Sequence, residues 1–320
     1  MKLNKVIKRI GIFSLGICMV SCASKNAPNG SNNPVVSSEE VELIATSKEF
    51  NAYWYNGTAE LSTYELSQAR YGEMHPGNEV LIFVTEDYNM KKQVKRESVS
   101  DDQYSSILKL NRIKRFTTGI YDYSMMTSVF KAVDTEKHPM AFKVNSSSQD
   151  WCGHTWSNLV YDENGGYTQH LDSYFESEAG EDKKLGKAMS EDAVFTQIRL
   201  DPNDLPQGKF RMIPSMNYSR FSHVELKPEE VSGKLLLEST VDETELHSYT
   251  LEYTSGRTIK IYFEPAFPYT IQGWEEKRKS GFGDSAKWLT TIATLKNIVN
   301  TNYWAKHSTS DVDMRKMLGL

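Results

Sequence analysis

The strongest fold signal lies in the stretch His247-Ser248-Tyr249-Thr250-Leu251-Glu252-Tyr253-Thr254-Ser255-Gly256-Arg257-Thr258-Ile259-Lys260-Ile261-Tyr262-Phe263. In its second half the apolar residues alternate with Thr258, Lys260 and Tyr262. This period of two gives a strand one apolar face and one polar face, and residues 247–254 alternate in the same way. Gly256 sits between the two runs and can take the positive φ that a tight turn requires. The sequence therefore predicts a β-hairpin.

Similar alternation, rich in β-branched and aromatic residues, extends over most of the chain. It predicts strands at 53–55, 59–68, 79–85, 116–123, 127–133, 140–145, 166–175, 195–200, 209–213, 218–226 and 233–238. Residues 288–299 fit either a helix or a strand, and we favour a strand because threonines and β-branched residues dominate. We expect a mainly β fold, with large antiparallel sheets that are curved or sandwich-like and few short helices.

The amino-terminal residues carry an export signal. Cations precede an apolar run at 10–20, which is too short to span a bilayer, since spanning needs about 20 residues. The following Met19-Val20-Ser21-Cys22 resembles the lipobox of bacterial lipoproteins, where cleavage occurs before a lipid-modified cysteine. The resemblance implies a signal peptide at 1–21, a lipid on Cys22 and a membrane as partner. A cleaved secretory signal with a coincidental cysteine is the alternative.

The residue after the anchor cysteine bears on sorting. Ala23 stands where an aspartate would resemble an inner-membrane retention signal, so we expect the outer membrane, on its periplasmic side. Residues 22–45 are rich in Ser, Asn, Pro and Gly and predict a flexible tether.

The rest of the chain has one candidate boundary between two halves. The polar stretch 181–192 is the best candidate for a connection between a β-rich first half (46–180) and a β-rich second half (193–320), and one large domain would fit equally. We expect a short closing helix within 310–320. Loss of residues 1–21 would leave 33 basic against 42 acidic side chains, because four of the 37 basic residues are removed. That balance argues against a nucleic-acid partner.

Cys152 is the only cysteine expected in the folded part, so an internal disulfide is excluded. The motif Trp151-Cys152-Gly153-His154-Thr155 begins like a thioredoxin site but lacks the second cysteine. A thiol nucleophile with His154 as base is a second hypothesis, although two such positions on one strand lie about 7 Å apart. We favour a cysteine that simply packs in a strand or bulge.

Aromatic residues supply the ligand-binding candidates, because their faces give a large contact area at low entropy cost. The candidates are Trp54, Tyr55, Arg70, Trp151, Trp156 and Trp274. Packing in a β core is the favoured alternative for the aromatic residues. No histidine pair has zinc-ligand spacing and no phosphate-binding loop is present, so the sequence predicts neither a metal nor a cofactor.

Several short motifs together resemble a family of uncharacterised bacterial envelope lipoproteins. They are Trp54-Tyr55-Asn56-Gly57, Gln68-Ala69-Arg70-Tyr71-Gly72-Glu73, Val80-Leu81-Ile82-Phe83-Val84-Thr85-Glu86-Asp87, Gln149-Asp150-Trp151-Cys152-Gly153 and Ser280-Gly281-Phe282-Gly283. Members have carried the label "septum formation inhibitor Maf". The opening motif of the true Maf nucleotide pyrophosphatases is absent here, so that activity is not carried over. The resemblance implies an envelope address and a shared fold, and it assigns no catalytic residue.

The sequence supports three functional hypotheses. The first is a non-enzymatic binding module for a lipid, glycan or protein partner, which predicts a curved sheet with an aromatic concave face. The second is an envelope hydrolase that uses Cys152 and His154, which predicts that both converge with a carboxylate in an open pocket. The third is a structural scaffold whose exposed strand edges join neighbouring molecules.

Overall fold

The computed structural model describes residues 46–98, 103–178, 180, 182–239 and 245–320. The described residues belong to one compact unit, Leu43–Leu320. The predicted signal peptide, the predicted lipid-attachment residue Cys22 and the predicted tether to residue 45 lie outside the described residues.

A single 16-stranded sheet dominates the part of the chain that the structure describes. Its strands are β1 (Ala59–Arg70), β2 (Glu73–Asn89), β3 (Val94–Lys95), β4 (Tyr104–Thr118), β5 (Tyr121–Ala132), β6 (Ala141–Asp150), β7 (Gly153–Asp162), β8 (Gly166–Ser173), β9 (Lys183–Gly186), β10 (Met189–Ser190), β11 (Gly208–Ile213), β12 (Glu229–Ser239), β13 (Glu245–Tyr253), β14 (Thr258–Phe263), β15 (Ile271–Ser280) and β16 (Lys287–Thr301).

The α-helices of the described residues are short. They are α1 (Lys48–Trp54), α2 (Val194–Leu200), α3 (Met216–Ser222) and α4 (Met314–Met317). Single 3₁₀ turns accompany them, and two of these, η1 (Glu176–Glu178) and η2 (Glu191–Ala193), lie next to edge strands of the sheet. The expectation of a mainly β fold with few short helices is confirmed.

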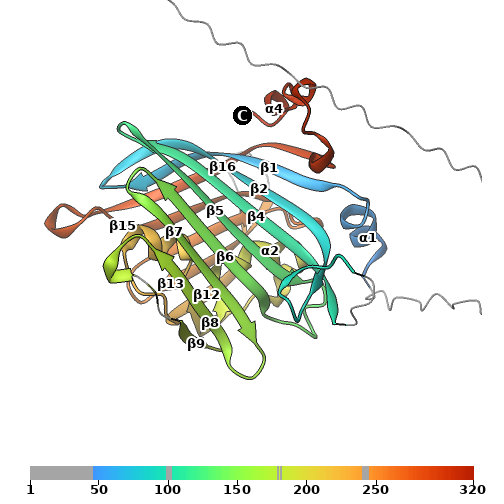
Figure 1. Cartoon of the computed structure of the whole chain (residues 1–320), viewed down its shortest axis with the longest axis horizontal. Coiled ribbons are helices and arrows are strands. Elements are labelled where there is room, and N and C mark those ends of the chain that lie inside the picture. Colours follow the sequence, from blue (N-terminus) through green and yellow to red (C-terminus); the bar gives the residue numbers. More distant parts are fainter. Residues whose placement is uncertain (1–45, 99–102, 179, 181, 240–244) are drawn as a thin grey trace, which may run out of the picture. The chain divides into compact units, whose positions relative to one another are not determined.

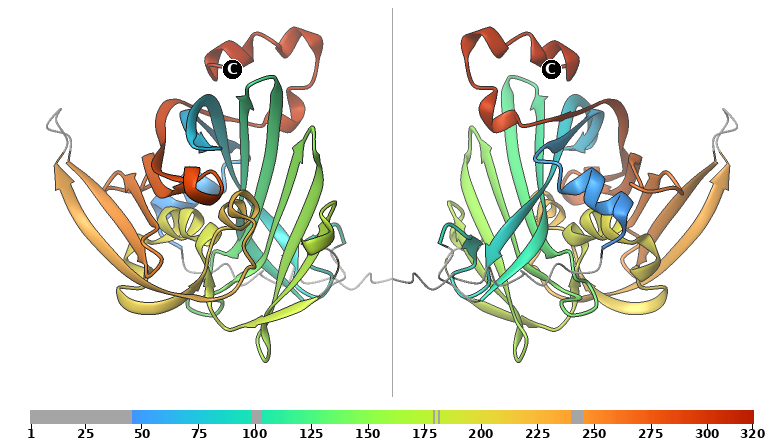
Figure 2. Two further views of the ribbon diagram at one scale, coloured as in Figure 1. Left: turned by 90° about the vertical axis from the view of Figure 1, so that its left-hand side faces the viewer. Right: turned by 90° about the vertical axis from the view of Figure 1, so that its right-hand side faces the viewer.

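The strand order is β10-β11-β12-β13-β14-β15-β16-β1-β2-β4-β5-β6-β7-β8-β9, with β3 beside β2. The pairings are antiparallel except for β10 with β11, which is parallel. The sheet is strongly curved, and the yellow helices α2 and α3 lie on its concave side (Figures 1 and 2). The predicted hairpin is present as β13 and β14, paired in register from His247↔Phe263 to Glu252↔Thr258.

Strands from both sides of residues 181–192 join this one sheet. That stretch, expected to be a polar connection, contains the edge strands β9 and β10 and the start of η2. The predicted strand at 288–299 is confirmed as β16, and the predicted closing helix is confirmed as α4.

Three predicted strands are wrong. Residues 53–55 form the end of α1 and its C-cap, Tyr55. The helix follows an N-cap, Ser47, whose side chain accepts a hydrogen bond from Phe50 N. Residues 195–200 form α2, and 218–226 begin inside α3. All residues of α2 are buried, so its apolar and β-branched run does not alternate against solvent and resembles a strand. The strands that were not predicted are β4 over most of its length, β7, β15 and the short strands β3, β9 and β10.

Buried ion pairs fasten the helical segments to the concave face. The guanidinium of Arg199 on α2 binds both carboxylate oxygens of Glu60 on β1, each at 2.5 Å, and both side chains are fully buried. Arg257 binds both oxygens of Glu191 on η2 at 2.6 Å. A third group joins strands only: Glu79 accepts from Arg112 at 2.8 Å and lies 3.5 Å from Lys114. Burying unpaired charges is costly, and pairing offsets that cost.

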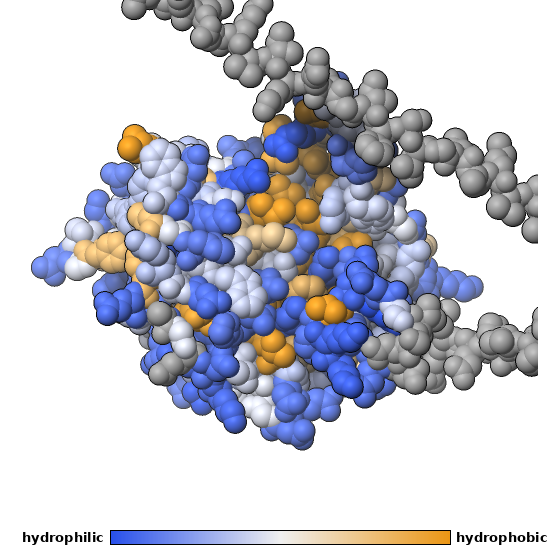
Figure 3. All heavy atoms as spheres, viewed as in Figure 1, coloured by the Kyte–Doolittle hydropathy of each residue, from blue (hydrophilic) through white to orange (hydrophobic). Residues whose placement is uncertain are grey.

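The outer face of the sheet is covered in part by the C-terminal segment. Tyr303, Leu318 and Leu320 pack against a cluster on β1 and β2, composed of Ala59, Leu61, Val80, Ile82 and Val84. Thr63 donates a hydrogen bond to the Leu318 carbonyl at 2.7 Å. Figure 3 shows apolar residues gathered on this face near α4.

We expect Leu318→Asp to lower the free energy of unfolding by about 1–2 kcal/mol, because a carboxylate would be placed on an apolar surface. Met317→Asp is the matched control: Met317 is 60% exposed and should tolerate the same change within about 0.5 kcal/mol. Urea unfolding of both variants tests the packing. Equal losses would contradict the docking of the C-terminal segment.

Candidate functional site

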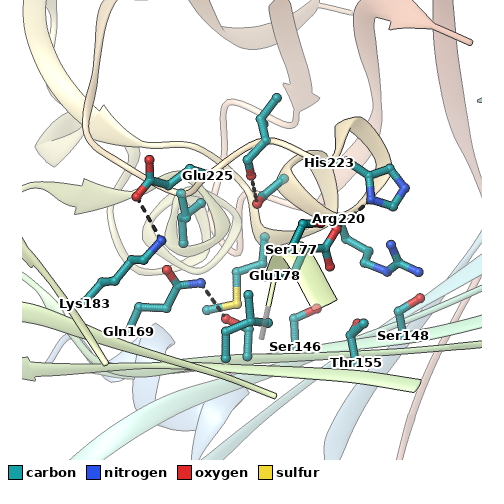
Figure 4. A pocket seen from close by; sticks show the side chains of 16 residues that line it. Ser146, Ser148, Thr155, Gln169, Ser177, Glu178, Lys183, Arg220, His223 and Glu225 are labelled. Atoms are coloured by element: carbon teal, nitrogen blue, oxygen red, sulfur yellow. Dashed lines mark hydrogen bonds and ion pairs between the residues drawn. The ribbon is translucent and has the colours of Figure 1, made fainter. Parts of the chain in front are cut away.

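A polar cavity of about 520 Å³ lies between the concave face of β6, β7 and β8 and the helix α3 with the segments that flank it (Figure 4). Six of its sixteen lining residues carry a hydroxyl group and only four are apolar, so the cavity is more polar than a typical hydrophobic ligand pocket. The lining is Ser146, Ser148, Thr155, Ser157, Gln169, Leu171, Ser177, Glu178, Lys183, Met216, Ser219, Arg220, His223, Val224, Glu225 and Leu226.

The sheet wall of the cavity is a small lattice of hydroxyl groups. In the β6–β7 register Ser146 stands opposite Ser157, and Ser148 stands opposite Thr155, so alternate positions on both strands point to the same face. Gln169 on β8 donates to Ser157 Oγ at 3.1 Å. Ser148 is only 2% exposed, yet its Oγ has no hydrogen-bond partner among the described residues. Buried hydroxyl groups usually have one.

The helix wall is held in place by Asp192. Its carboxylate accepts hydrogen bonds from Ser215 Oγ at 2.8 Å and from Met216 N at 3.0 Å, at the N-terminus of α3. Burial raises the pKa of Asp192 above its ordinary value of 3.8, although these hydrogen bonds oppose the rise. At its other end α3 stops because His223 adopts a left-handed conformation with φ of 51°.

Arg220 contributes spare donors to this wall. Its Nη2 lies 3.5 Å from Asp150 Oδ2, and its guanidinium lies 4.7 Å from the ring centre of Phe175. Its Nε and Nη1 are buried and have no hydrogen-bond partner among the described residues. A buried donor without an acceptor costs about 1–3 kcal/mol of folding free energy. A ligand that accepts hydrogen bonds from these donors would therefore bind more tightly.

The charges around the cavity balance. His223 Nδ1 lies 2.6 Å from Glu178 Oε1, and Lys183 Nζ lies 2.9 Å from Glu225 Oε1. Since Arg220 lies beside Asp150, each basic side chain of the lining has an acidic neighbour. The wall therefore offers hydrogen bonds without a strong net field, which suits a hydrophilic and uncharged ligand.

Cys152 lies outside this cavity. It is exposed in the turn between β6 and β7, where its backbone N–H donates to Asp150 Oδ1 at 2.7 Å. The expectation of a packed cysteine is therefore wrong, because a two-residue turn projects the side chain into solvent. His154 is exposed on the outer face, in a separate depression with Trp156 and Asp172. Within the described part of the chain, no hydrogen bond joins the Cys152 thiol to the His154 ring.

The aromatic candidates do not share one cleft. Trp54 and Trp274 belong to the main core at 2% and 3% exposure, with Trp274 against Tyr64 and Phe195. Tyr55 is partly exposed and shares a hydrogen bond with Ser106 at 2.8 Å. Core packing thus accounts for two of the tryptophans, and the expected aromatic concave face is replaced at the cavity by hydroxyl groups.

Arg70 and Trp151 lie at the same end of the sheet, linked through the rings of Tyr123 and Tyr121. We call this group the aromatic collar. It comprises Tyr71, Tyr121, Tyr123, Trp151, Tyr174, Phe175 and Phe282. Arg70 lies beneath it, donating to the Phe221 carbonyl at 2.6 Å, with its guanidinium 4.1 Å from the centre of the Tyr71 ring.

Sequence reasoning missed the cavity residues Ser146, Ser148, Ser157 and Arg220. The available signal was Asn145-Ser146-Ser147-Ser148, a polar run that continues directly from the strand predicted at 140–145. Because every member of the run is polar, hydrophobic alternation gives no indication that the strand continues or which side chains point inward.

In the described segments, no group of three or more His, Cys, Asp or Glu residues is placed to hold a metal ion. No helix among the described residues is long and apolar enough to cross a membrane.

The fold and site define a protein with one strongly curved sheet and a hydroxyl-lined cavity on its concave side. No protein-family model, curated protein or solved structure matches the chain. The resemblance to envelope lipoproteins stays a prediction.

Proposed function

We propose that the chain is a non-catalytic binding module of the bacterial envelope, held by a lipid on Cys22 at the periplasmic side of the outer membrane. Its cavity takes a neutral, hydroxyl-rich ligand of the saccharide class. The observation that carries the proposal is that both walls of the cavity hold buried polar atoms without a hydrogen-bond partner among the described residues: Ser148 Oγ in the sheet wall, and Nε and Nη1 of Arg220 in the helix wall.

The lining favours a saccharide over a lipid. An acyl chain would have to displace water from six hydroxyl groups and five ionisable side chains without replacing their hydrogen bonds. A saccharide can exchange those hydrogen bonds one for one. The volume of about 520 Å³ also lies within the range of about 300–1,000 Å³ typical of small-molecule sites.

The hydrolase hypothesis has no supporting geometry. Cys152 sits in an exposed turn, and neither it nor His154 lines the cavity. The scaffold hypothesis draws no specific support from a contact of the described residues.

A direct test is saturation-transfer NMR on the full chain with a panel of neutral disaccharides: maltose, cellobiose, lactose and N,N′-diacetylchitobiose. We expect at least one to receive saturation from the protein and to lose it in the Ser148→Ala variant. Decanoate is the opposing probe. Binding of decanoate in this cavity, with no disaccharide bound, would contradict the proposal.

Ser148→Ala should separate binding from stability. We expect affinity for the bound disaccharide to fall about 5–10-fold, since one neutral hydrogen bond contributes about 1 kcal/mol, while stability stays nearly unchanged because the removed hydroxyl has no partner. Ser128→Ala is the matched control, for which we expect the opposite pair of effects. Ser128 donates to Asn111 Oδ1 at 2.7 Å and does not line the cavity, so its loss should lower stability and leave binding unchanged. Isothermal titration and urea unfolding measure the two effects.

A further inference from the structure

The end of the sheet that carries the aromatic collar presents apolar side chains at four turns. These are Tyr71 between β1 and β2, Ile120 between β4 and β5, Trp151 between β6 and β7, and Phe282 between β15 and β16. Their exposed fractions are 38%, 83%, 69% and 54%. Tyr174, which follows β8, is 74% exposed. The four turns lie together at the left-hand end of the sheet in Figure 1.

The side chains of the collar are contiguous. The Tyr71 and Phe282 rings are 6.1 Å apart, and Gly72 N donates to Ser280 Oγ at 3.2 Å, which joins the two turns. Tyr121 links Trp151, at 6.3 Å, to Tyr123, at 5.7 Å.

The other half of the collar is joined through His223. Its ring lies 5.9 Å from Phe282 and 5.6 Å from Phe175, which in turn lies 5.9 Å from Tyr174. Tyr174 packs against Gly153, where an added Cβ would come within 2.9 Å of the tyrosine ring. The exposed apolar groups therefore form one surface, not scattered single residues.

We propose that the aromatic collar docks on the interface of a lipid bilayer, and this inference rests on the proposed lipid anchor at Cys22. Aromatic side chains concentrate where the hydrocarbon of a bilayer meets its headgroups, because one end of each ring is apolar and the other can be polar. The groups project from separate turns, so they suit insertion into a deformable surface.

The charges at this end select the type of lipid. Arg70, Lys279 and Lys287 lie at these turns together with Glu73, Asp122, Asp150 and Asp284, so the basic side chains do not outnumber the acidic ones. Anionic lipids are recruited by clusters of Lys and Arg that lack such acidic neighbours. The collar therefore fits an interface of neutral, zwitterionic headgroups such as phosphatidylcholine or phosphatidylethanolamine.

The chain between the proposed anchor and the folded part is long enough for this orientation. Helix α1 precedes β1, at the end of β1 opposite to Tyr71, so the tether must reach back past a strand of 12 residues, about 40 Å. Residues 23–47 number 25, and at full extension they span at most about 85 Å. Deletion of residues 26–41 leaves nine, or about 30 Å, which is too short.

The test uses the full, lipid-modified protein in phosphatidylcholine vesicles with or without brominated acyl chains, which quench tryptophan fluorescence on contact. The difference between the wild type and Trp151→Phe isolates the Trp151 signal. Because apolar groups at an interface reach about 5–10 Å into the acyl boundary, we expect bromolipid to reduce this signal by about half.

The double variant Ile120→Ser/Phe282→Ser and the 26–41 deletion should each abolish the quenching. The control Val312→Ser/Met317→Ser, at residues 60% exposed elsewhere, should keep it.

The outcomes separate the docking from the anchor. Protein that floats with vesicles but shows no bromolipid quenching of Trp151 overturns the docking alone, and so does quenching that survives the tether deletion. Protein that does not float overturns the anchor and with it the docking. In vesicle-free buffer we expect aqueous iodide to quench Trp151; protection from iodide would identify the collar as an interface between copies of the chain and overturn the inference.

Discussion

Replacing Glu60 with alanine should lower the free energy of unfolding by about 3–5 kcal/mol, the cost of leaving a buried charge without its partner. Arg199 would keep only the Pro268 carbonyl, which accepts from its Nε at 2.8 Å. Its guanidinium is otherwise enclosed by the rings of Trp54 and Phe83, at 5.0 and 4.9 Å. Since this pair joins α2 to β1, the loss should appear in global unfolding by urea.

Two comparisons make that expectation specific. Glu65 lies on the same strand and pairs with Lys296, but both side chains are more than half exposed, so Glu65→Ala should cost no more than about 1 kcal/mol. The double variant Glu60→Met/Arg199→Met removes both charges, and it should be more stable than Glu60→Ala alone. If the single and double variants were equally destabilised, shape and not charge would be responsible.

The Glu60 effect should also depend on pH. Burial alone would raise the pKa of Glu60, but the charge and hydrogen bonds of Arg199 outweigh burial and hold that pKa below its ordinary value of 4.5. The folded state therefore releases this proton more readily than the unfolded state does. The stabilisation is present above about pH 4.5 and is lost as the pH falls through the lower folded value. The gap between wild type and Glu60→Ala should shrink in that range.

Lys131→Met should act in the opposite direction and stabilise the protein. Lys131 is fully buried on β5, and burial lowers its pKa from 10.5 to about 8, with Asp204 opposing the shift. A shift of this size corresponds to a cost of about 3 kcal/mol for burying the charged form at pH 7. Methionine would lose the hydrogen bond to the Pro139 carbonyl, about 1 kcal/mol, so the expected net gain is about 2 kcal/mol.

The pH dependence of stability tests whether the buried charge of Lys131 is the reason that Lys131→Met is more stable. Between about pH 8 and 10.5 folding of the wild type releases a proton, so its stability rises with pH while that of Lys131→Met does not. The advantage of the variant should therefore disappear by about pH 10.5. Lys184→Met, at an exposed position of β9, should change stability by less than about 0.5 kcal/mol at any of these pH values. An advantage that persisted at high pH would point to packing instead of charge.

The sheet was predictable because most of its strands have one apolar face. The β13–β14 hairpin and β16 follow from alternation and turn residues alone. The failure at α2 has a clear physical origin, which is burial on all sides. Every residue of α2 is buried, so Val194, Phe195 and Ile198 give no helical stripe, and its interior position depends on the Glu60–Arg199 pair, which alternation cannot reveal.

The candidate site was less predictable than the fold. Ser148 and Arg220 are 72 positions apart and line the same cavity only because α3 lies across the concave face of β6. They matter because their buried polar atoms have no hydrogen-bond partner among the described residues, and no sequence pattern can indicate this. Arg70 and Trp151 were recognised individually, but their position at the same end of the sheet depends on turns of different hairpins that strand register brings together.

The measurement that tests the central claim most directly is the affinity of Arg220→Lys for the disaccharide identified by NMR, determined by isothermal titration. Lysine keeps a positive charge for Asp150 but removes the planar donors Nε and Nη1. We predict a folded variant whose dissociation constant rises about tenfold or more, as expected for loss of a charged donor worth about 1.5–3 kcal/mol. An unchanged dissociation constant in a folded Arg220→Lys protein would show that the ligand binds elsewhere and would contradict a saccharide site in this cavity.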